Sequence, residues 1–152
     1  IGLETDAKTI SAKDNLFLLI EETNKGNRLS CVLLDEAQFL TKSQVFSLGE
    51  IVDKLEIPVL AYGLRSDFRG ELFEGSLHLL AWADELVEIK TICHCGKKAG
   101  MVLRIDENGE PVNIGDQVKI GGNDIYVSVC RKHFKQQQAE NILDGSGADL
   151  SS

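Results

Sequence analysis

The stretch that decides the fold reads Cys31-Val32-Leu33-Leu34-Asp35-Glu36-Ala37-Gln38-Phe39. An apolar run that ends in two carboxylates is typical of a buried parallel strand, and ligands of α/β sheets gather at the carboxyl ends of such strands. An aspartate there holds Mg²⁺ in phosphoryl-transfer sites, and Glu36, on the opposite side of the extended chain, is placed to accept a proton. A plain turn or helix-capping role for Asp35 stays open. We expect Cys31 to be buried in the core.

Composition sets the class of protein. The chain has 152 residues, 43% hydrophobic and 26% charged, enough for one globular domain and a small appendage. The formal net charge of −8 argues against nucleic acid as a partner. No apolar run reaches the length of a membrane span and no secretory signal is visible, so we expect no membrane and a reducing, cytoplasmic setting. The opening Ile1 predicts a start that is internal to a longer protein.

The rest of the first half predicts further elements of an α/β fold. Helical periodicity predicts a helix over 12–24, and Thr41 begins a second helix because a glutamine follows it in capping-box spacing. A second buried strand over 59–64 gives the order strand, helix, strand, which is a parallel crossover. A short helix over 77–82 and a third strand over 86–89 are predicted after it.

The loop at 65–73 follows the second strand, at the same end of the sheet as Asp35. It carries two arginines and two phenylalanines outside any periodic pattern. Packing under the loop is the simplest role for Phe68 and Phe73, and solvated positions are the simplest for the arginines.

The character of the sequence changes after residue 90, where cysteines begin to cluster. Cys93 and Cys95 are followed later by Cys130 and His133. Two side chains in Cys-x-x-His spacing can face one centre across a turn, and the Cys-x-Cys half is tighter than usual. A Cys₃His set satisfies tetrahedral zinc with no open position, which is the structural arrangement. Whether His94 replaces one of the two neighbouring cysteines stays open.

The residues between the two halves of this cluster alternate and contain an Asn-Gly turn, which predicts a β-ribbon clamped at its base by the metal. An excursion held at both ends can fold over a ligand as a lid, with Gly121 and Gly122 allowing close backbone approach. The Gln-rich and Gly-Ser-containing end predicts a disordered tail. We therefore divide the chain into 1–90, 91–136 and 137–152.

Four motifs, in this order along the chain, resemble the type II thymidine kinases and are most similar to the bacterial members. They are Asp-Glu-Ala-Gln-Phe at 35–39, Tyr-Gly-Leu-Arg-Ser-Asp-Phe at 62–68, Thr-Ile-Cys-His-Cys-Gly at 91–96, and Ile-Gly-Gly at 120–122 closing with 126–133. The resemblance implies an α/β fold with a P-loop-kinase-type parallel sheet and a small zinc-ribbon-like lasso domain. It also implies transfer of the γ-phosphate of ATP to the 5′-hydroxyl of thymidine, which gives dTMP.

The resemblance further implies roles for individual residues. Glu36 would be the general base on the 5′-hydroxyl, and the nucleotide and its Mg²⁺ would be held by Asp35, Glu36, Ala37 and Gln38. The nucleoside would be contacted by Phe39, Leu64, Phe68, Phe73, Gln117, Gly121 and Tyr126. Structural zinc would be bound by Cys93, Cys95, Cys130 and His133. The family also implies a homotetramer with dTTP as a feedback ligand.

One feature departs from the family pattern. The chain contains no G-x-x-x-x-G-K-[ST] sequence, which carries the phosphates of the nucleotide in this family. We therefore interpret the chain as the C-terminal portion of such a kinase, with the first strand of the sheet missing, one edge exposed, and little catalysis on its own. Two alternatives stay open: another P-loop ATPase, and a non-catalytic zinc-ribbon interaction module.

Overall fold

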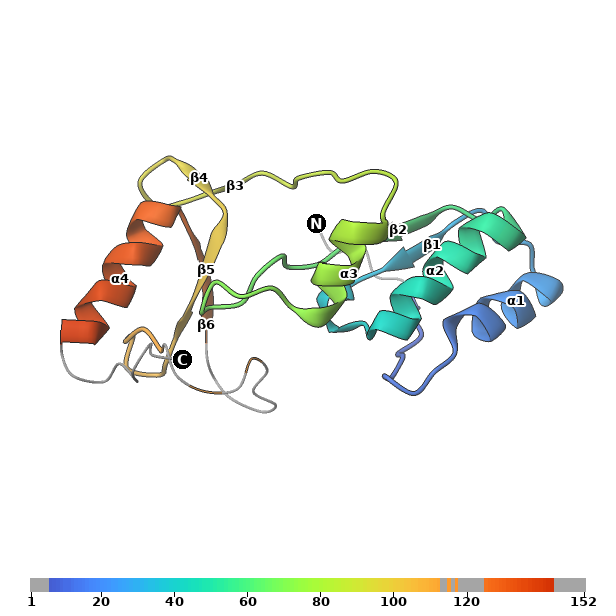
Figure 1. Cartoon of the computed structure of the whole chain (residues 1–152), viewed down its shortest axis with the longest axis horizontal. Coiled ribbons are helices and arrows are strands. Elements are labelled where there is room, and N and C mark those ends of the chain that lie inside the picture. The colour runs from blue at the N-terminus through green and yellow to red at the C-terminus, as the bar shows by residue number, and fades with distance from the viewer. Residues whose placement is uncertain (1–5, 113–114, 116, 118–124, 144–152) are drawn as a thin grey trace. The chain divides into compact units, whose positions relative to one another are not determined.

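The structure is a computed structural model of the chain, and it describes residues 6–112, 115, 117 and 125–143, without the side chains of 138–143. The chain divides into two compact units (Figure 1). Unit 1 comprises Ile1–Leu64 and Glu74–Glu85, and unit 2 comprises Arg65–Phe73 and Leu86–Ser152. Each unit is mixed in its secondary structure, and each is described by itself.

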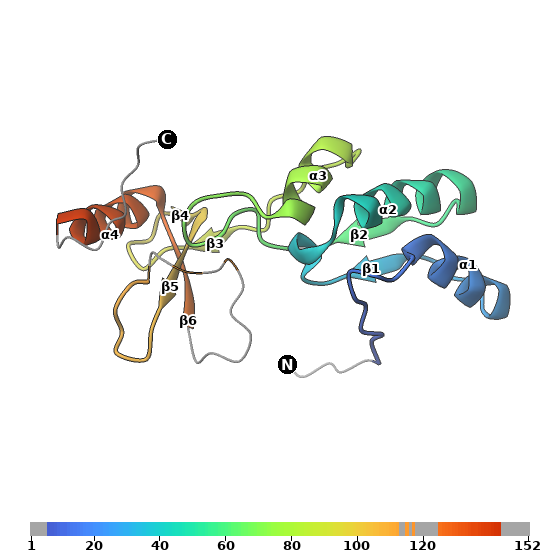
Figure 2. The same cartoon turned by 60° about the horizontal axis from the view of Figure 1, so that its bottom comes forward.

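Unit 1 is built on a small parallel sheet. Strand β1 (Val32–Leu34) pairs in parallel with β2 (Val59–Ala61), so both strands end at the same edge. Helix α2 (Lys42–Leu55) connects them and runs beside them (Figure 2). The predicted capping box is confirmed, because the Thr41 hydroxyl accepts from the Gln44 N–H while the Gln44 side chain accepts from the Thr41 N–H. The predicted strand, helix and parallel strand are therefore present.

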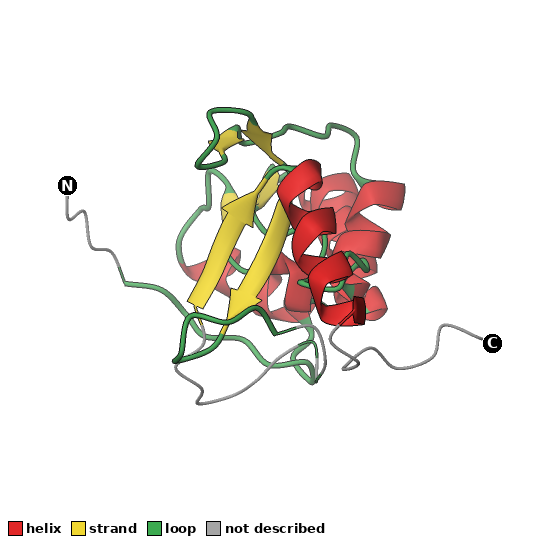
Figure 3. Cartoon of the chain, turned by 90° about the vertical axis from the view of Figure 1, so that its left-hand side faces the viewer, coloured by secondary structure: helices red, strands yellow, loops and turns green. Residues whose placement is uncertain are grey.

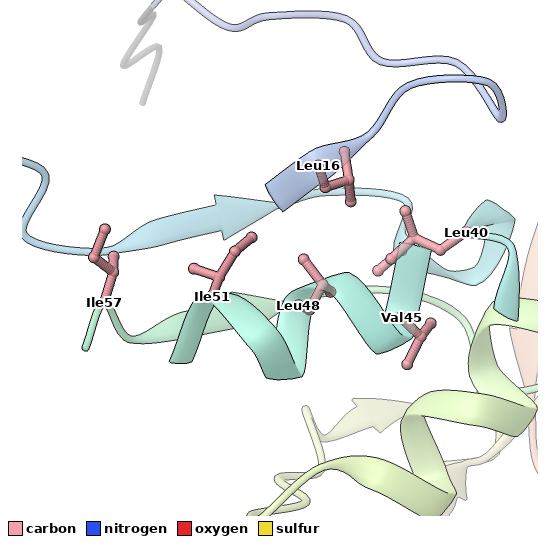
Figure 4. Packing of buried hydrophobic residues seen from close by; sticks show 7 residues of the cluster. Leu16, Leu40, Val45, Leu48, Ile51 and Ile57 are labelled. Atoms are coloured by element: carbon pink, nitrogen blue, oxygen red, sulfur yellow. The ribbon is translucent and has the colours of Figure 1, made fainter. Parts of the chain in front are cut away.

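Two further helices complete unit 1. Helix α1 (Leu16–Gly26) begins four residues later than predicted because the Asn15 side chain caps it by accepting the Leu18 N–H. Helix α3 (Glu74–Trp82) contains the helix predicted over 77–82. Figure 4 shows Leu48 and Ile51 pointing from α2 toward the sheet. The buried core of this unit consists of Leu16, Ala37, Leu40, Val45, Leu48, Ile51 and Ile57.

Two predictions for this half are wrong. Cys31 is exposed rather than buried, because β1 begins only at Val32 and alternate residues of the strand face away from α2; Leu33, on the same face as Cys31, is 65% exposed. The third strand predicted over 86–89 is absent from the described chain, where Val87 and Ile89 are exposed and lie outside any helix or strand. An apolar run forms a strand only where a neighbouring strand accepts its hydrogen bonds, and none of the described strands pairs with these residues.

Unit 2 is built on two antiparallel pairs. Strands β3 (Thr91–Ile92) and β4 (Lys98–Ala99) form a short hairpin. Strands β5 (Met101–Ile105) and β6 (Ile125–Val129) form the ribbon that the alternation predicted, and Figure 3 shows them side by side in yellow. Helix α4 (Arg131–Leu143) follows β6. The core of this unit consists of Cys93, Ala99, Leu103, Val129, Cys130 and Phe134.

The Asn-Gly turn lies at the end of β5 rather than joining the two strands of the ribbon. The Gly109 N–H donates to the Asp106 carbonyl, and a bridge pairs Ile105 with Pro111. Gly121 and Gly122 lie outside the described residues. The predicted tail at 137–152 begins within α4, and its part beyond Leu143 also lies outside them. None of the helices in the described part of the chain has the length and apolarity to cross a bilayer.

Candidate active site and metal centre

The chain turns sharply at the carboxyl end of β1. Glu36 adopts a left-handed backbone conformation, with φ of 53°, and leads into the 3₁₀ helix η1 (Ala37–Phe39). Its side chain therefore does not alternate with that of Asp35 along an extended chain, as the sequence suggested. Both carboxylates are exposed, and the Asp35 Oδ1 accepts the Glu36 N–H at 2.9 Å.

The end of β2 holds this turn in place. The Tyr62 N–H donates to the Leu34 carbonyl, and the Ala37 N–H donates to the Tyr62 carbonyl, each at 2.8 Å. These two bonds carry the strand pairing past Ala61 and into the turn. The backbone around Glu36 is therefore fixed by the neighbouring strand and not only by local sequence.

Gln38 is the buried polar residue of this region, with an exposed fraction of 2%. Its Nε2 donates to the Glu36 Oε2 at 2.5 Å, and its Oε1 accepts the Leu64 N–H at 3.0 Å. Both ends of the side-chain amide are thus used inside unit 1.

Two glycines allow the close packing around η1. A Cβ on Gly63 would lie 2.6 Å from the Gln38 Oε1, and a Cβ on Gly75 would lie 2.4 Å from the Ala37 carbonyl oxygen. The Ser76 hydroxyl donates to the Leu64 carbonyl at 2.6 Å, which ties α3 to the same segment. The end of β1, the end of β2 and the start of α3 therefore form one hydrogen-bonded assembly.

The loop at 65–73 is organised around a residue that the sequence did not single out, Asp67. Its carboxylate is 2% exposed; Oδ1 accepts the N–H groups of Arg69 and Glu71 at 2.9 Å each, and Oδ2 pairs with the Arg69 guanidinium at 3.0 Å. The same Oδ2 accepts from the Gln117 Nε2 at 3.0 Å. An aspartate followed by a glycine-containing turn is a recognisable Asx-turn signal, but its bond to Gln117 has no local signal.

The residues predicted to contact the nucleoside differ in exposure. In unit 1, Phe39 and Leu64 are exposed. In unit 2, Phe68 and Phe73 are buried and Tyr126 is exposed, while Gly121 lies outside the described residues. Phe68 contacts the guanidiniums of Arg69 and Arg104, whose carbons lie 5.8 and 5.1 Å from the ring centroid. Arg104, itself buried on β5, was missed because an arginine in a strand usually faces solvent.

The four predicted metal ligands come together in unit 2. The Sγ atoms of Cys93, Cys95 and Cys130 and a ring nitrogen of His133 all lie within 4.8 Å of one another. The His133 Nδ1 is 3.3 Å from the Cys93 Sγ and 3.7 Å from the Cys130 Sγ. The Sγ atoms of Cys95 and Cys130 are 3.8 Å apart. Zinc–sulfur bonds of about 2.3 Å in a tetrahedron require sulfur atoms about 3.8 Å apart, so this donor set fits zinc.

The two halves of the cluster come from different elements. Cys93 and Cys95 lie in the turn between β3 and β4, while Cys130 and His133 lie at the junction of β6 and α4. The His94 ring stacks on that of His133 with centroids 4.2 Å apart, and its Nδ1 lies 3.6 Å from the Cys93 Sγ. His94 is not one of the four converging donors.

The thiols differ in their tendency to ionise. Desolvation by burial opposes ionisation of Cys93, but hydrogen bonds from the backbone of Cys95, the His133 ring and the backbone of Cys130 lower its pKa from 9.0 to about 5. The backbone of Lys97 favours the Cys95 thiolate, but desolvation and the sulfurs of Cys93 and Cys130 outweigh it and raise the pKa of Cys95. The geometry therefore favours the Cys93 thiolate over that of Cys95, and a bound cation would favour the ionised form of Cys95.

Comparison with known proteins identifies the family. The family model described as "Thymidine kinase" matches residues 1–134. The chain belongs to the thymidine kinase family. The thymidine kinase of Photobacterium profundum is 62% identical over 136 residues, which are 90% of this chain and 71% of that protein. That of Aliivibrio fischeri is 60% identical over the same shares of the two chains. That of Salmonella typhimurium is 59% identical over 143 residues, 94% of this chain and 70% of the relative.

These matches confirm the predicted family and the predicted class of enzyme, a transferase. They favour neither of the two alternatives, a different P-loop ATPase or a non-catalytic zinc-ribbon module.

Proposed function

We propose that the chain carries the acceptor-activating part of a thymidine kinase, with Glu36 as the general base that takes the proton of the thymidine 5′-hydroxyl as the γ-phosphate of ATP is transferred. The observation that carries the proposal is an exposed carboxylate at the end of a parallel strand, held by a buried amide. A base placed within reach of a hydroxyl accelerates such a reaction about 10²–10⁴-fold. The product of the proposed reaction is dTMP.

Nucleotide binding is assigned to the same strand end. We place Asp35, Glu36, Ala37 and Gln38 on the nucleotide side, in a sheet of the P-loop-kinase type. Asp35 is exposed, and the hard oxygen ligand it offers suits Mg²⁺. Bound Mg²⁺ would neutralise the charge that develops on the phosphates. The chain's own contribution is to fix Asp35 beside Glu36 through the bond between them.

Nucleoside binding is assigned to the predicted aromatic and lasso residues. Phe68 is buried, with the guanidinium carbons of Arg69 and Arg104 at 5.8 and 5.1 Å from its ring centroid, and Gln117 is held by Asp67; these contacts support an ordered loop at residues 65–73. The residues proposed to contact thymidine are Phe39, Leu64, Phe68, Phe73, Gln117, Gly121 and Tyr126. We further propose a cytoplasmic homotetramer that takes dTTP as a feedback ligand, as the family implies.

The metal centre is assigned a structural role. Four protein donors in tetrahedral spacing leave no position for substrate, and zinc bound there would join the β3–β4 turn to the start of α4. We propose a kinase domain at 1–90, a zinc-binding lasso domain at 91–136 and a tail at 137–152. In the structure, residues 65–73 and 86–90 belong to unit 2, and α4 extends to Leu143.

Replacement of Glu36 by Gln in the full-length protein tests the proposal. We expect kcat to fall about 10²–10⁴-fold, while the KM values for thymidine and Mg·ATP change little, because the amide keeps the shape but cannot take the proton. Glu22→Gln, an exposed glutamate of α1, is the matched control and should leave kcat unchanged. Thymidine phosphorylation at the parent rate in the Glu36→Gln variant would remove Glu36 from the role of base.

A further inference from the structure

We propose that Gln38 is a positioning residue for Glu36, and that it acts through the donor end of its side-chain amide rather than by contact with the nucleotide. The inference rests on the proposed function, because it requires Glu36 to be the base. It differs from the role that the family resemblance implies for Gln38, which is to help hold the nucleotide and its Mg²⁺.

The orientation of the Gln38 amide follows from its partners. The Leu64 N–H can only donate, so the amide oxygen must face it, at 3.0 Å. The Nε2 then necessarily faces the Glu36 carboxylate, which can only accept when ionised, at 2.5 Å. No flipped arrangement satisfies both partners. The amide therefore has one orientation, in which it connects the backbone at the end of β2 to the Glu36 carboxylate after β1.

The surroundings prevent the amide from leaving this position. Gln38 is 2% exposed, and even a methyl group on Gly63 would lie 2.6 Å from its Oε1. Releasing the amide inside this space would leave a buried donor and a buried acceptor without partners, which is costly. A side chain whose two polar ends are both engaged in this way is poorly suited to bind phosphate or Mg²⁺ directly.

Glu36 needs such support because its own position is otherwise open. It lies on an exposed turn in a left-handed backbone conformation, and an exposed glutamate samples several rotamers. In the described part of the chain the amide bonds to the Oε2 of Glu36, which leaves Oε1 to take the proton of the acceptor hydroxyl. A misplacement of about 1 Å at a reacting group can cost about 100-fold in rate.

Two variants of Gln38 distinguish the contribution of the amide N–H donor from that of the amide oxygen. Gln38→Glu keeps the size and the acceptor toward Leu64 but replaces the donor toward Glu36, and Gln38→Met removes both ends at similar length. We expect both to lower kcat about 100-fold with KM for thymidine and for Mg·ATP within a few-fold. The deficit of Gln38→Glu should grow between about pH 6 and 9, because an ionised carboxyl cannot donate and repels its neighbour.

Three results would overturn the inference. Parent-like kcat of Gln38→Glu at every pH, with a loss only in Gln38→Met, would mean that Gln38 merely supports Leu64. A rise in the KM for Mg·ATP with kcat retained would mean that Gln38 contacts the nucleotide. A lowered melting temperature, with a parent-like kcat at temperatures below that melting point, would mean that Gln38 has a structural role alone.

Reference variants keep the outcome interpretable. If Glu36→Gln remains active, Glu36 is not the general base and the proposed function fails. If Glu36→Gln is inactive while Gln38→Glu is fully active, only the positioning role of Gln38 fails. Should Gln38→Met not fold, Gln38→Glu carries the test alone, through the pH dependence of its kcat.

Discussion

The strand-end site of unit 1 and the cysteine cluster of unit 2 hold their functional atoms in opposite ways. At the strand end, the buried amide and the backbone of the turn are bonded to protein partners: Gln38 bonds to Glu36 and to Leu64, and Ala37 bonds to Tyr62. In the cluster, three sulfurs and a ring nitrogen converge within 4.8 Å, and their nearest polar neighbours are mostly one another. The first arrangement is complete without an added group, and the second is complete only when a cation neutralises its thiolates.

The comparison predicts that loss of one cluster ligand has the largest effect on the protein. Cys130→Ser should release the metal and unfold the β3–β4 turn and the start of α4, because structural zinc contributes about 10–16 kcal/mol in small folding units. Zinc content by elemental analysis and protease resistance of residues 86–143 measure the effect.

The chain supplies its own control for this experiment. Cys31 is an exposed cysteine of unit 1, so Cys31→Ser should keep both the metal and the protease resistance. Full zinc content in Cys130→Ser would contradict the ligand assignment.

A second prediction concerns how the stability of the cysteine cluster depends on pH. The pKa of Cys93 is lowered from 9.0 to about 5, so ionised Cys93 stabilises the folded cluster fully above pH 9.0, and this stabilisation is lost as the pH falls toward 5. The unfolding free energy of chelator-treated protein should therefore rise with pH across this window.

Urea unfolding between about pH 5.5 and 8.5 measures this slope. Cys93→Ser removes the thiol and should flatten it, while Cys31→Ser should preserve it. An equal slope in Cys93→Ser and in the parent protein would mean that another group dominates the pH dependence.

Sequence reasoning succeeded where the signal is local. The capping box at Thr41 needs residues only three positions apart, and the parallel strands are indicated by two apolar runs joined by a helix. The cysteine cluster was found because its spacing reflects ligand geometry directly. These features depend on chemistry that the chain carries in short stretches.

The remaining features depend on partners far away in the sequence. The left-handed turn at Glu36 is set by the Tyr62 carbonyl and the Leu64 N–H, and the exposure of Cys31 is set by which face of β1 the helices cover. No local pattern reports either. The bond between Asp67 and Gln117 likewise joins residues fifty positions apart.

The third prediction, the smallest of the three, asks whether unit 2 also contains a site completed by protein groups alone. Asp67 accepts two backbone N–H groups, the Arg69 guanidinium and the Gln117 amide, much as Gln38 links its neighbours in unit 1. Asp67→Asn places an amide donor against other donors and should destabilise the loop by about 1.5–3 kcal/mol, the value of a hydrogen bond to a charged group. Urea unfolding and the KM for thymidine measure the change.

Gln117→Ala should have a smaller effect than Asp67→Asn. It removes one hydrogen bond to the Asp67 carboxylate and leaves the other three in the 65–73 loop. We expect a loss of about 1 kcal/mol and a smaller rise in KM than in Asp67→Asn. The double variant should lose little more than Asp67→Asn alone, since the two residues share one interaction. Additive losses would show that Gln117 acts independently of Asp67, and that the loop, unlike the strand end of unit 1, is not held by a shared polar contact.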